Sequence, residues 1–480
     1  MIGKLKVYAD RMSQPCRAVL IFCRLNGIDF EEIKVDISKR HHLSPEFTEV
    51  NPLQKVPAIL HGNLNLFESH AILVYLSSAF PGIADHWYPT DVFKRAKVNS
   101  VLDWHHSNLR YGEVNYVSNT VLGPALGRPL NPKAAAEAEK VLLSSLSKLE
   151  NIWLNGDGRF LLGNFQPSIA DLSLVCELTQ LEVLDEKDRS RILSPYKKVV
   201  GWIEDTRTAT NPHFEEVHNI LYRAKKKFQQ QRSRIAESGT ETSNNMGRHS
   251  KMLNGIDFEE IKVDIAKSHH LSPEFTEVNP LQKVPAILHG NLNLFESHAI
   301  LAYLSSAFPG IADHWYPTDV IRRAKINSIL DWHHSNLRYG AEIYVTNTVL
   351  GPALGRPRNP KAAAEAEKVL LSSLSKLENI WLNGDGRFLF GSFQPSIADL
   401  SLVCELTQLE VLDEMDRGRI LSPYKKVLGW IEDTRTATNP YFEEMHNILY
   451  RAKKKFQQQR SRIAESGTET TNNRGRHSKM

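Results

Sequence analysis

The first eighty residues combine strand-like and helix-like patterns of hydrophobic and polar positions. Apolar and polar side chains alternate over residues 4–9, which predicts a short strand. Residues 13–27 predict a helix, because Pro15 suits its first turn and Asn26-Gly27 suits its end. Similar patterns predict a strand over 30–37, two strands over 55–68, and a helix over 69–80 with Ser69 as its N-cap. This order indicates a small α/β domain.

Helical periodicity dominates the following stretch of the chain. Apolar positions recur with the 3.6-residue period in five segments: 93–110, 132–154, 167–184, 194–209 and 211–231. Pro132 and Pro167 are placed to open helices, and Ser168 with Asp171 forms a capping-box pattern. We therefore expect a helical domain after a linker of Pro, Gly and Trp over residues 80–91.

The chain repeats itself, but the repeat is incomplete. The segment LNGIDFEEIKVDI begins at Leu25 and again at Leu253, and the match continues without a gap at a constant offset of 228 residues (253 − 25). A repeated unit of this size indicates a duplicated pair of domains rather than a solenoid. Residues 1–24 have no counterpart in the second copy, and the polar residues 236–252 predict a linker.

Composition narrows the class of protein. Hydrophobic residues make up 41% of the chain and charged residues 24%, which is ordinary for a globular protein. The N-terminus lacks the continuous apolar core of a signal peptide, and we find no apolar run near the ~18 residues of a membrane span. A net charge of +4 gives no argument for nucleic acid. Four cysteines without a CxxC or Cys/His cluster favour neither a zinc site nor a disulfide framework.

Six motifs together resemble the cytosolic glutathione S-transferases, and most closely their plant theta class. They are VYADRMSQPCRAV, NPLQKVPAI, LFESHAILVYL, DHWYP, DWHHSNLR and QPSIADLSL. The resemblance covers nearly all of both copies. It implies a thioredoxin-like domain that binds glutathione, followed by a helical domain that binds the electrophile. It implies glutathione as co-substrate, with no metal and no prosthetic group.

The repeat and the resemblance together set the expected domain boundaries. The fold class is α/β plus all-α, duplicated, with the second thioredoxin-like domain truncated. The expected segments are 1–82 (thioredoxin-like), 91–230 (helical), 231–252 (linker), 253–310 (truncated thioredoxin-like), 319–458 (second helical domain) and 459–480 (polar tail).

Ser13 is the candidate activator of the glutathione thiol. Ionising a thiol with a pKa near 8.5 at neutral pH requires a shift of ~2 units, or roughly 2.7 kcal/mol. Ser13 stands just before the first predicted helix, so its hydroxyl and the helix dipole can both act on one sulfur. By resemblance, the serine of S-Q-P has this role; the alternative is an ordinary N-cap serine. Cys16 is expected to be a buried helix residue rather than a reactive thiol.

The resemblance also implies a set of glutathione-binding residues. These are Ser13, Gln14, His42, Leu43, Lys55, Val56, Pro57, Glu68 and Ser69. A cis peptide bond at Val56-Pro57 would let the backbone pair with the cysteinyl part of glutathione. Glu68 would take the γ-glutamyl amino group, and Ser69 with the helix amides its carboxylate. Lys55 and His42 would contact the glycine carboxylate, although both also suit plain exposed positions.

Arg110 is the second candidate catalytic residue. By resemblance it lines the electrophile pocket and stabilises the thiolate or a departing anion; the alternative is a solvated arginine at a helix end. Trp104, His105 and His106 are expected to be packing residues, since two adjacent histidines lack metal-ligand spacing. Asp171 is expected to serve the fold rather than turnover.

The second copy repeats the binding residues without a counterpart of Ser13. Its remnants are His270, Leu271, Lys283, Val284, Pro285, Glu296 and Ser297. The strand missing from this copy is interior in the family fold, so residues 258–265 should lose their partner and the sheet should expose edges. Three interpretations stay open. The copy docks as a pseudo-subunit, its edges drive aggregation, or the sequence is a gene-model join of two neighbouring genes that dropped a short first exon.

The function expected from the sequence is conjugation of glutathione to electrophiles, with reduction of organic hydroperoxides as a companion activity. The alternatives are a non-catalytic carrier of glutathione conjugates or apolar ligands, and a scaffold. The expected partners are glutathione and small apolar electrophiles, without nucleic acid or membrane, in a homodimer or an internal pseudo-dimer. The C-terminal Ser478-Lys479-Met480 resembles a peroxisomal signal, so we expect the protein in the cytoplasm or peroxisome, and the basic run near each copy's end also suits nuclear import.

Overall fold

The structure, a computed structural model, describes residues 3–454 except 126, 233–255, 257 and 266. The described residues form two compact units. Unit 1 contains those of Met1–His249 and Phe258–Asp331, and unit 2 those of Ser250–Asp257 and Trp332–Met480. None of the helices in the described residues is both long and apolar enough to span a membrane.

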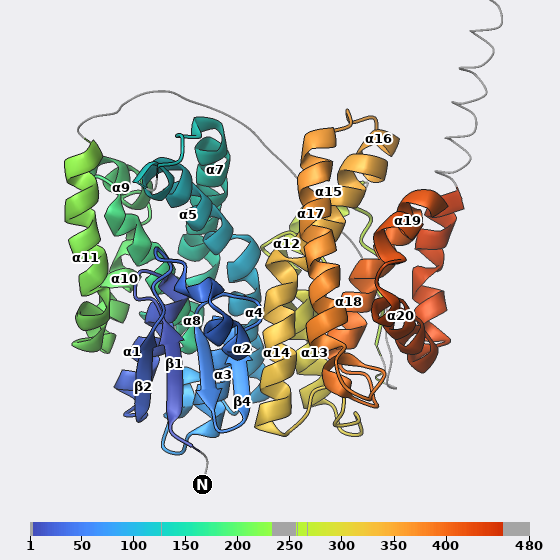
Figure 1. The fold of residues 1–480 in the computed structure, drawn as a ribbon, viewed down its shortest axis with the longest axis horizontal. Helices are drawn as coiled ribbons and strands as arrows, with labels where there is room; N and C mark the ends of the chain where they lie inside the picture. The colour runs from blue at the N-terminus through green and yellow to red at the C-terminus, as the bar shows by residue number, and fades with distance from the viewer. Residues whose placement is uncertain (1–2, 126, 233–255, 257, 266, 455–480) are drawn as a thin grey trace, which may run out of the picture. The chain divides into compact units, whose positions relative to one another are not determined.

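Unit 1 begins with the expected small α/β domain, drawn in blue in Figure 1. Its elements are β1 (Leu5–Ala9), α1 (Gln14–Leu25), β2 (Phe30–Lys34), α2 (Pro45–Val50), β3 (Ala58–His61), β4 (Leu64–Phe67) and α3 (Ser69–Ala79). The strands form one sheet in the order β2-β1-β3-β4. β2 runs parallel to β1, whereas β3 is antiparallel to both β1 and β4. This is the thioredoxin-like arrangement that the sequence predicts.

Two of the predicted element boundaries are corrected by the structure. Ser69 is the first residue of α3 and Glu68 is its N-cap, with a φ of 68°, so the N-cap predicted for Ser69 is one residue off. Pro167 does not open a helix: Ser168 is the N-cap of α8, and the helix starts at Ile169. The residues that shape both turns precede the apolar periodicity, which therefore fixes these ends only to within a residue or two.

Helix α1 forms the centre of the α/β domain. All its residues from Cys16 to Cys23 are buried, so it is covered on every side rather than on one stripe. It contacts α3 of its own domain and α8 and α11 of the helical domain. The buried Arg17 donates to the carbonyl of Cys176 on α8 at 3.1 Å. Arg17 also donates to Oε1 of Gln180 at 2.7 Å, so a buried charge ties the two domains together.

The helical domain of unit 1 follows in the order of the predicted apolar stripes. Its helices are α4 (Val92–Ser107), α5 (Leu109–Val117), α6 (Gly123–Ala125), α7 (Pro132–Lys148), α8 (Ile169–Thr179), α9 (Glu186–Leu193), α10 (Lys197–Thr210) and α11 (His213–Arg232). Asp171 is fully buried near the start of α8 and accepts hydrogen bonds from the backbone N–H of Leu161 and Ser168 and from Nε1 of Trp202. It joins two helices and a loop, which agrees with the structural role predicted for it.

Unit 1 also contains the truncated part of the second copy. Its elements are α12 (Pro273–Val278), β5 (Ala286–His289), β6 (Leu292–Phe295), α13 (Ser297–Ala307) and the part of α14 (Val320–Ser335) up to Asp331. β5 and β6 form a two-stranded sheet. Residues 258–265, the counterpart of β2 and of the three residues after it, form no strand. The sequence predicts this loss, because the partner strand β1 has no counterpart in the second copy.

Unit 2 is a helical domain like that of unit 1. Its helices include α15 (Leu337–Val345), α16 (Gly351–Ala353), α17 (Pro360–Lys376), α18 (Ile397–Thr407), α19 (Glu414–Leu421) and α20 (Lys425–Thr438), and residues 441–454 are helical too. Trp332 and Trp381 are fully buried with ring centroids 4.3 Å apart. The core of this domain therefore forms although the strand and helix before it are missing.

Candidate active site

The sheet brings most of the predicted glutathione-binding residues to one end. Ala58, the first residue of β3, lies opposite Tyr8 of β1 and opposite Phe67 of β4. The segment that follows β1, the residues before β3 and the residues after β4 must therefore meet at this end. These are the segments that carry Ser13, Val56-Pro57 and Glu68-Ser69.

Ser13 stands directly before α1. It is the N-cap of α1, and its hydroxyl makes no capping hydrogen bond to the helix. Pro15 occupies the first turn, as predicted. A helix N-terminus whose capping side chain makes no bond to the helix amides offers amide donors, a hydroxyl and a positive dipole end to a nearby anion.

Cys16 lies three residues further along α1 and is fully buried. Burial raises the pKa of its thiol to about 12, although the hydroxyl of Ser13 opposes this shift. A thiol with such a pKa is protonated and poorly nucleophilic at neutral pH. Cys16 therefore belongs to the packing of α1, in agreement with the sequence-based expectation.

Val56 and Pro57 are joined by a cis peptide bond, as expected, immediately before β3. Lys55 is exposed beside them. His42 and Leu43 lie in a short 3₁₀ helix, His41–Leu43, between β2 and α2. Because β2 is parallel to β1, the segment after β2 leaves the sheet at the end that holds Ser13.

Glu68 and Ser69 mark the start of α3. Glu68 adopts a φ of 68°, in the left-handed region, so the chain turns sharply from β4 into the helix. The first amides of a helix suit a carboxylate, and that of Ala71 already donates to Oδ2 of Asp331 at 2.8 Å. Arg110 lies close enough for its charge to act on Glu68.

Arg110 is tied to a buried carboxylate. Its Nη1 donates to Oε2 of Glu177 on α8 at 2.7 Å, and about a third of the Arg110 side chain is exposed. Burial opposes ionisation of Glu177, but Arg110 and His105 outweigh it and lower its pKa to about 2. The arginine is therefore a fixed charge held at the junction of the two domains rather than a solvated helix end.

A second buried acid, Glu113 on α5, lies beside Glu177 and Arg110 and also contacts the first residue of α1. Gln14 donates through Nε2 to Oε2 of Glu113 at 3.0 Å. Burial and the negative charge of Glu177 raise the pKa of Glu113 well above its ordinary value. Burial and the neighbouring carboxylate thus both favour the protonated form of Glu113.

Sequence reasoning missed Glu113 and Glu177. A signal for Glu177 was present, since it is the one acid within the apolar run Leu172–Leu178 on a helix that is buried along its whole length. Glu113 gives no such signal, because a glutamate on a half-polar helix is ordinary. Its importance comes from the contact with Gln14, 99 residues away in the chain.

The second copy retains the same local geometry without the serine. His270 and Leu271 lie in a 3₁₀ helix, His269–Leu271, and Val284-Pro285 is again cis. Glu296 is the N-cap of α13 with a φ of 71°, and Ser297 is its first residue. Lys283 and Glu296 both act on the charge of Lys148 at the end of α7. The second copy thus keeps the turn at Glu296 and the helix start at Ser297, and both lie in the part of unit 1 near Lys148 of the first copy.

Family models match both copies of the chain. The model described as "Glutathione S-transferase, N-terminal domain" matches residues 3–78 and 251–306, and that described as "Glutathione S-transferase, C-terminal domain" matches residues 132–205 and 360–433. Together with the fold and the site, these matches define the class. The chain belongs to the glutathione S-transferase family and carries its two domains twice.

Individual relatives place it within the plant theta class. It is 68% identical over 229 residues to glutathione S-transferase T1 of Arabidopsis thaliana, covering 48% of this chain and 94% of that protein. It is 37% identical to human glutathione S-transferase theta-1, covering 46% of this chain and 90% of that one. It spans 40% of the length of Arabidopsis T2 and T3. A solved human theta-class transferase, in complex with the glutathione conjugate of 1-menaphthyl sulfate, is 32% identical with a TM-score of 0.44, over 48% of this chain and 92% of that one.

Proposed function

We propose that the protein joins the sulfur of glutathione to electrophiles, with Ser13 as the residue that stabilises the thiolate. The observation that carries the proposal is the N-cap position of Ser13 together with a hydroxyl that makes no capping bond to α1. A hydroxyl donor and a helix N-terminus, both directed at one sulfur, favour its anionic form. The names of the relatives support the same activity.

The chemistry follows from an ionised thiol held in place. The thiol releases its proton to solvent, and the sulfur lone pair forms a C–S bond as the leaving group departs with its bonding electrons. Val56, Glu68 and Ser69 would hold the peptide, so that the reaction gains from proximity and orientation. Arg110, which Glu177 fixes in place, would present its positive charge where the leaving anion develops.

The same site suits reduction of hydroperoxides. A thiolate attacks the outer peroxide oxygen, which breaks the O–O bond and releases an alcohol after protonation. A second glutathione then displaces water from the sulfenic acid to give glutathione disulfide. This companion activity needs the thiolate and no further group, so it depends on Ser13 in the same way.

A paired substitution tests the role of Ser13. Ser13→Ala should reduce kcat/KM by about 100-fold or more, as loss of one positioned donor to a developing anion typically does. Ser272→Ala is the matched control, because Ser272 does cap its helix by accepting from the N–H of Phe275 and lies in the second copy. It should leave turnover unchanged.

The ultraviolet absorbance of bound glutathione separates the enzyme from a carrier. In the unchanged chain the bound thiolate should appear near neutral pH, and in Ser13→Ala only at a higher pH. Binding without a thiolate signal, together with unchanged turnover in Ser13→Ala, would contradict the serine mechanism and leave the non-catalytic carrier.

We also propose a peroxisomal location, based on Ser478-Lys479-Met480, which lies outside the described residues. A fluorescent protein fused to the N-terminus should enter peroxisomes, and deletion of the three residues should return it to the cytoplasm. Retention in peroxisomes after the deletion would contradict the assignment.

A further inference from the structure

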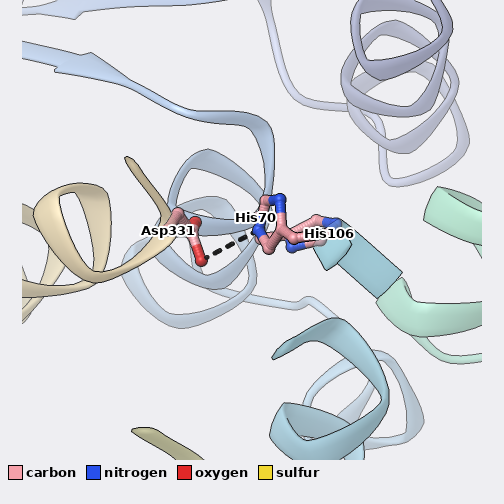
Figure 2. A group of neighbouring side chains, drawn as sticks. All are labelled: His70, His106 and Asp331. Atoms are coloured by element: carbon pink, nitrogen blue, oxygen red, sulfur yellow. Dashed lines mark ion pairs between the residues drawn. The ribbon is translucent and has the colours of Figure 1, made fainter. Parts of the chain in front are cut away.

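Two histidines and an aspartate meet in unit 1 at the start of α3, directly after Glu68 and Ser69. They are His70 on α3, His106 on α4 and Asp331 on α14, as Figure 2 shows. Each offers one ligand atom, and the three atoms lie within 4.8 Å of one another. Nε2 of His106 is 3.5 Å from Oδ1 of Asp331, and the rings of His70 and His106 have centroids 4.5 Å apart.

The three side chains are held in a buried setting. His70 is 3% exposed, and the side chains of His106 and Asp331 are 8% and 11% exposed. They come from three different helices, so the cluster is built by packing and not by the spacing of residues along one helix. Buried histidines and carboxylates at this separation are either paired with one another or bound to a metal ion.

Neighbouring groups orient two of the three ligands. Nε2 of His70 lies 3.1 Å from Nδ1 of His105, which fixes the plane of the His70 ring. The other carboxylate oxygen of Asp331, Oδ2, accepts a hydrogen bond from the backbone N–H of Ala71 at 2.8 Å. Such outer contacts are typical of protein metal sites, where they set ring orientation and ligand basicity.

The cluster borders a small cavity. Its volume is about 40 Å³, which is room for an ion with a water molecule. His70 and Asp331 line it together with their counterparts His298 and Asp103, whereas His106 does not.

The duplication has retained the whole set. At the offset of 228 residues, the counterparts of His70, His106 and Asp331 are His298, His334 and Asp103. The copies differ at other positions of the same helices, such as Val74 and Ala302. The two copies are therefore identical at all three pairs of positions.

We propose that His70, His106 and Asp331 bind a divalent transition-metal ion, for which Zn²⁺ is the best fit. Two imidazoles and one carboxylate form a borderline-soft set that suits zinc, with a fourth position for water. The ion would join α3 and α4 of the first copy to α14 of the second. The bound ion would hold these three helices of unit 1 together. Its tests measure bound zinc and unfolding midpoints, so they do not depend on the transferase activity proposed above.

Zinc content of the full chain, expressed without a histidine tag, is the first measurement. The chain is stripped with a chelator, dialysed against Zn²⁺ and washed, and bound zinc per chain is determined. Asp331→Asn and His106→Gln should each lower it by about one equivalent, because three ligands are needed to hold the ion. His41→Gln, an exposed histidine of the same copy, should lower it by none.

Asp331→Asn keeps a carbonyl that can accept from Ala71, so its unfolding midpoint in chelator should match that of the unchanged chain. Zn²⁺ should raise the midpoint of the unchanged chain and not that of the variant. Equal zinc content in all variants, or equal loss in His41→Gln, would overturn the proposal.

Cobalt absorption decides the question if Asp331→Asn fails to fold. The unchanged chain should show the strong visible d–d bands of four- or five-coordinate Co²⁺, and Zn²⁺ should abolish them. Only the weak bands of octahedral Co²⁺, or strong bands of unchanged intensity in His106→Gln, would overturn the assignment.

Discussion

At the scale of single residues, the two copies of the repeat differ at the position of Glu113. The second copy has Ala341 at this position, within a segment that otherwise keeps Arg338 and Gly340. The second copy also has no counterpart of Gln14, the residue that donates to Glu113 at 3.0 Å. The acid is thus present in the copy that has the Ser13 segment and absent from the copy that lost it. We infer that Glu113 positions Gln14, and through it the start of α1.

The raised pKa of Glu113 also predicts how the free energy of unfolding depends on pH. Burial and Glu177 raise its pKa, so above its ordinary value of 4.5 the native state keeps a proton that the unfolded chain releases. The native state then binds more protons than the unfolded state, and the free energy of unfolding falls as pH rises above 4.5. Glu113→Gln removes this titration and should flatten the fall.

Denaturant unfolding at a series of pH values measures this slope. Exposed Glu31 gives the control, because Glu31→Gln should leave the slope of the unchanged chain intact. An unaltered slope in Glu113→Gln would mean that the glutamate ionises in the native state.

At the scale of elements, the hydrophobic pattern predicts most helices and strands because each is decided within a few turns of chain. Residues 132–148 form α7, with Pro132 at its start, and Ser168 with Asp171 forms the capping box of α8. The ends at Ser69 and Pro167 were missed, since a left-handed residue or an extended turn is set by what the chain packs against. The fate of residues 258–265 was predictable, because a strand without its neighbour has no hydrogen-bonding partner.

The buried aspartates of α8 and α18 give a matched pair of element-scale substitutions. Asp171 and Asp399 make equivalent bonds, to Leu161, Ser168 and Trp202 or to Leu389, Ser396 and Trp430. Replacing either aspartate with Asn should lower the free energy of unfolding by about 1–3 kcal/mol, because a buried hydrogen-bond donor then has no acceptor.

Calorimetry should separate the two aspartate variants. Asp171→Asn should lower the unfolding transition of unit 1, and Asp399→Asn that of unit 2. Turnover below the transition should survive Asp399→Asn, because unit 2 contains no counterpart of Ser13. Equal loss of turnover in both variants would contradict this division of roles.

At the scale of the molecule, the contacts within unit 1 come in reciprocal pairs. Ser100 donates to the carbonyl of Phe295, and Ser328 donates to the carbonyl of Phe67, both at 2.8 Å. In the same way Asp103 accepts from Ala299 at 2.7 Å, and Asp331 accepts from Ala71 at 2.8 Å. Each pair maps onto the other by the offset of 228 residues, which is the pattern of a two-fold interface.

This pattern supports a pseudo-dimer within one chain. Light scattering should give the mass of a single chain, because the second copy already covers α3 and α4. Residues 1–252 alone should self-associate through the uncovered helices and keep full activity per Ser13. A full-length chain that dimerises while residues 1–252 stay monomeric would contradict the proposal.

The sequence by itself determined the duplication, the order of elements in each copy and the position of Ser13 before α1. Periodicity, caps and repeats act over short stretches, and they can be detected in the residues themselves. Tertiary structure decided which distant polar groups meet: Gln14 with Glu113 across 99 residues, and Ala71 with Asp331 across 260. Such pairs depend on how whole helices pack, and no local pattern fixes that packing. The acid pair beside Arg110 and the cluster of His70, His106 and Asp331 therefore became visible only in the folded chain.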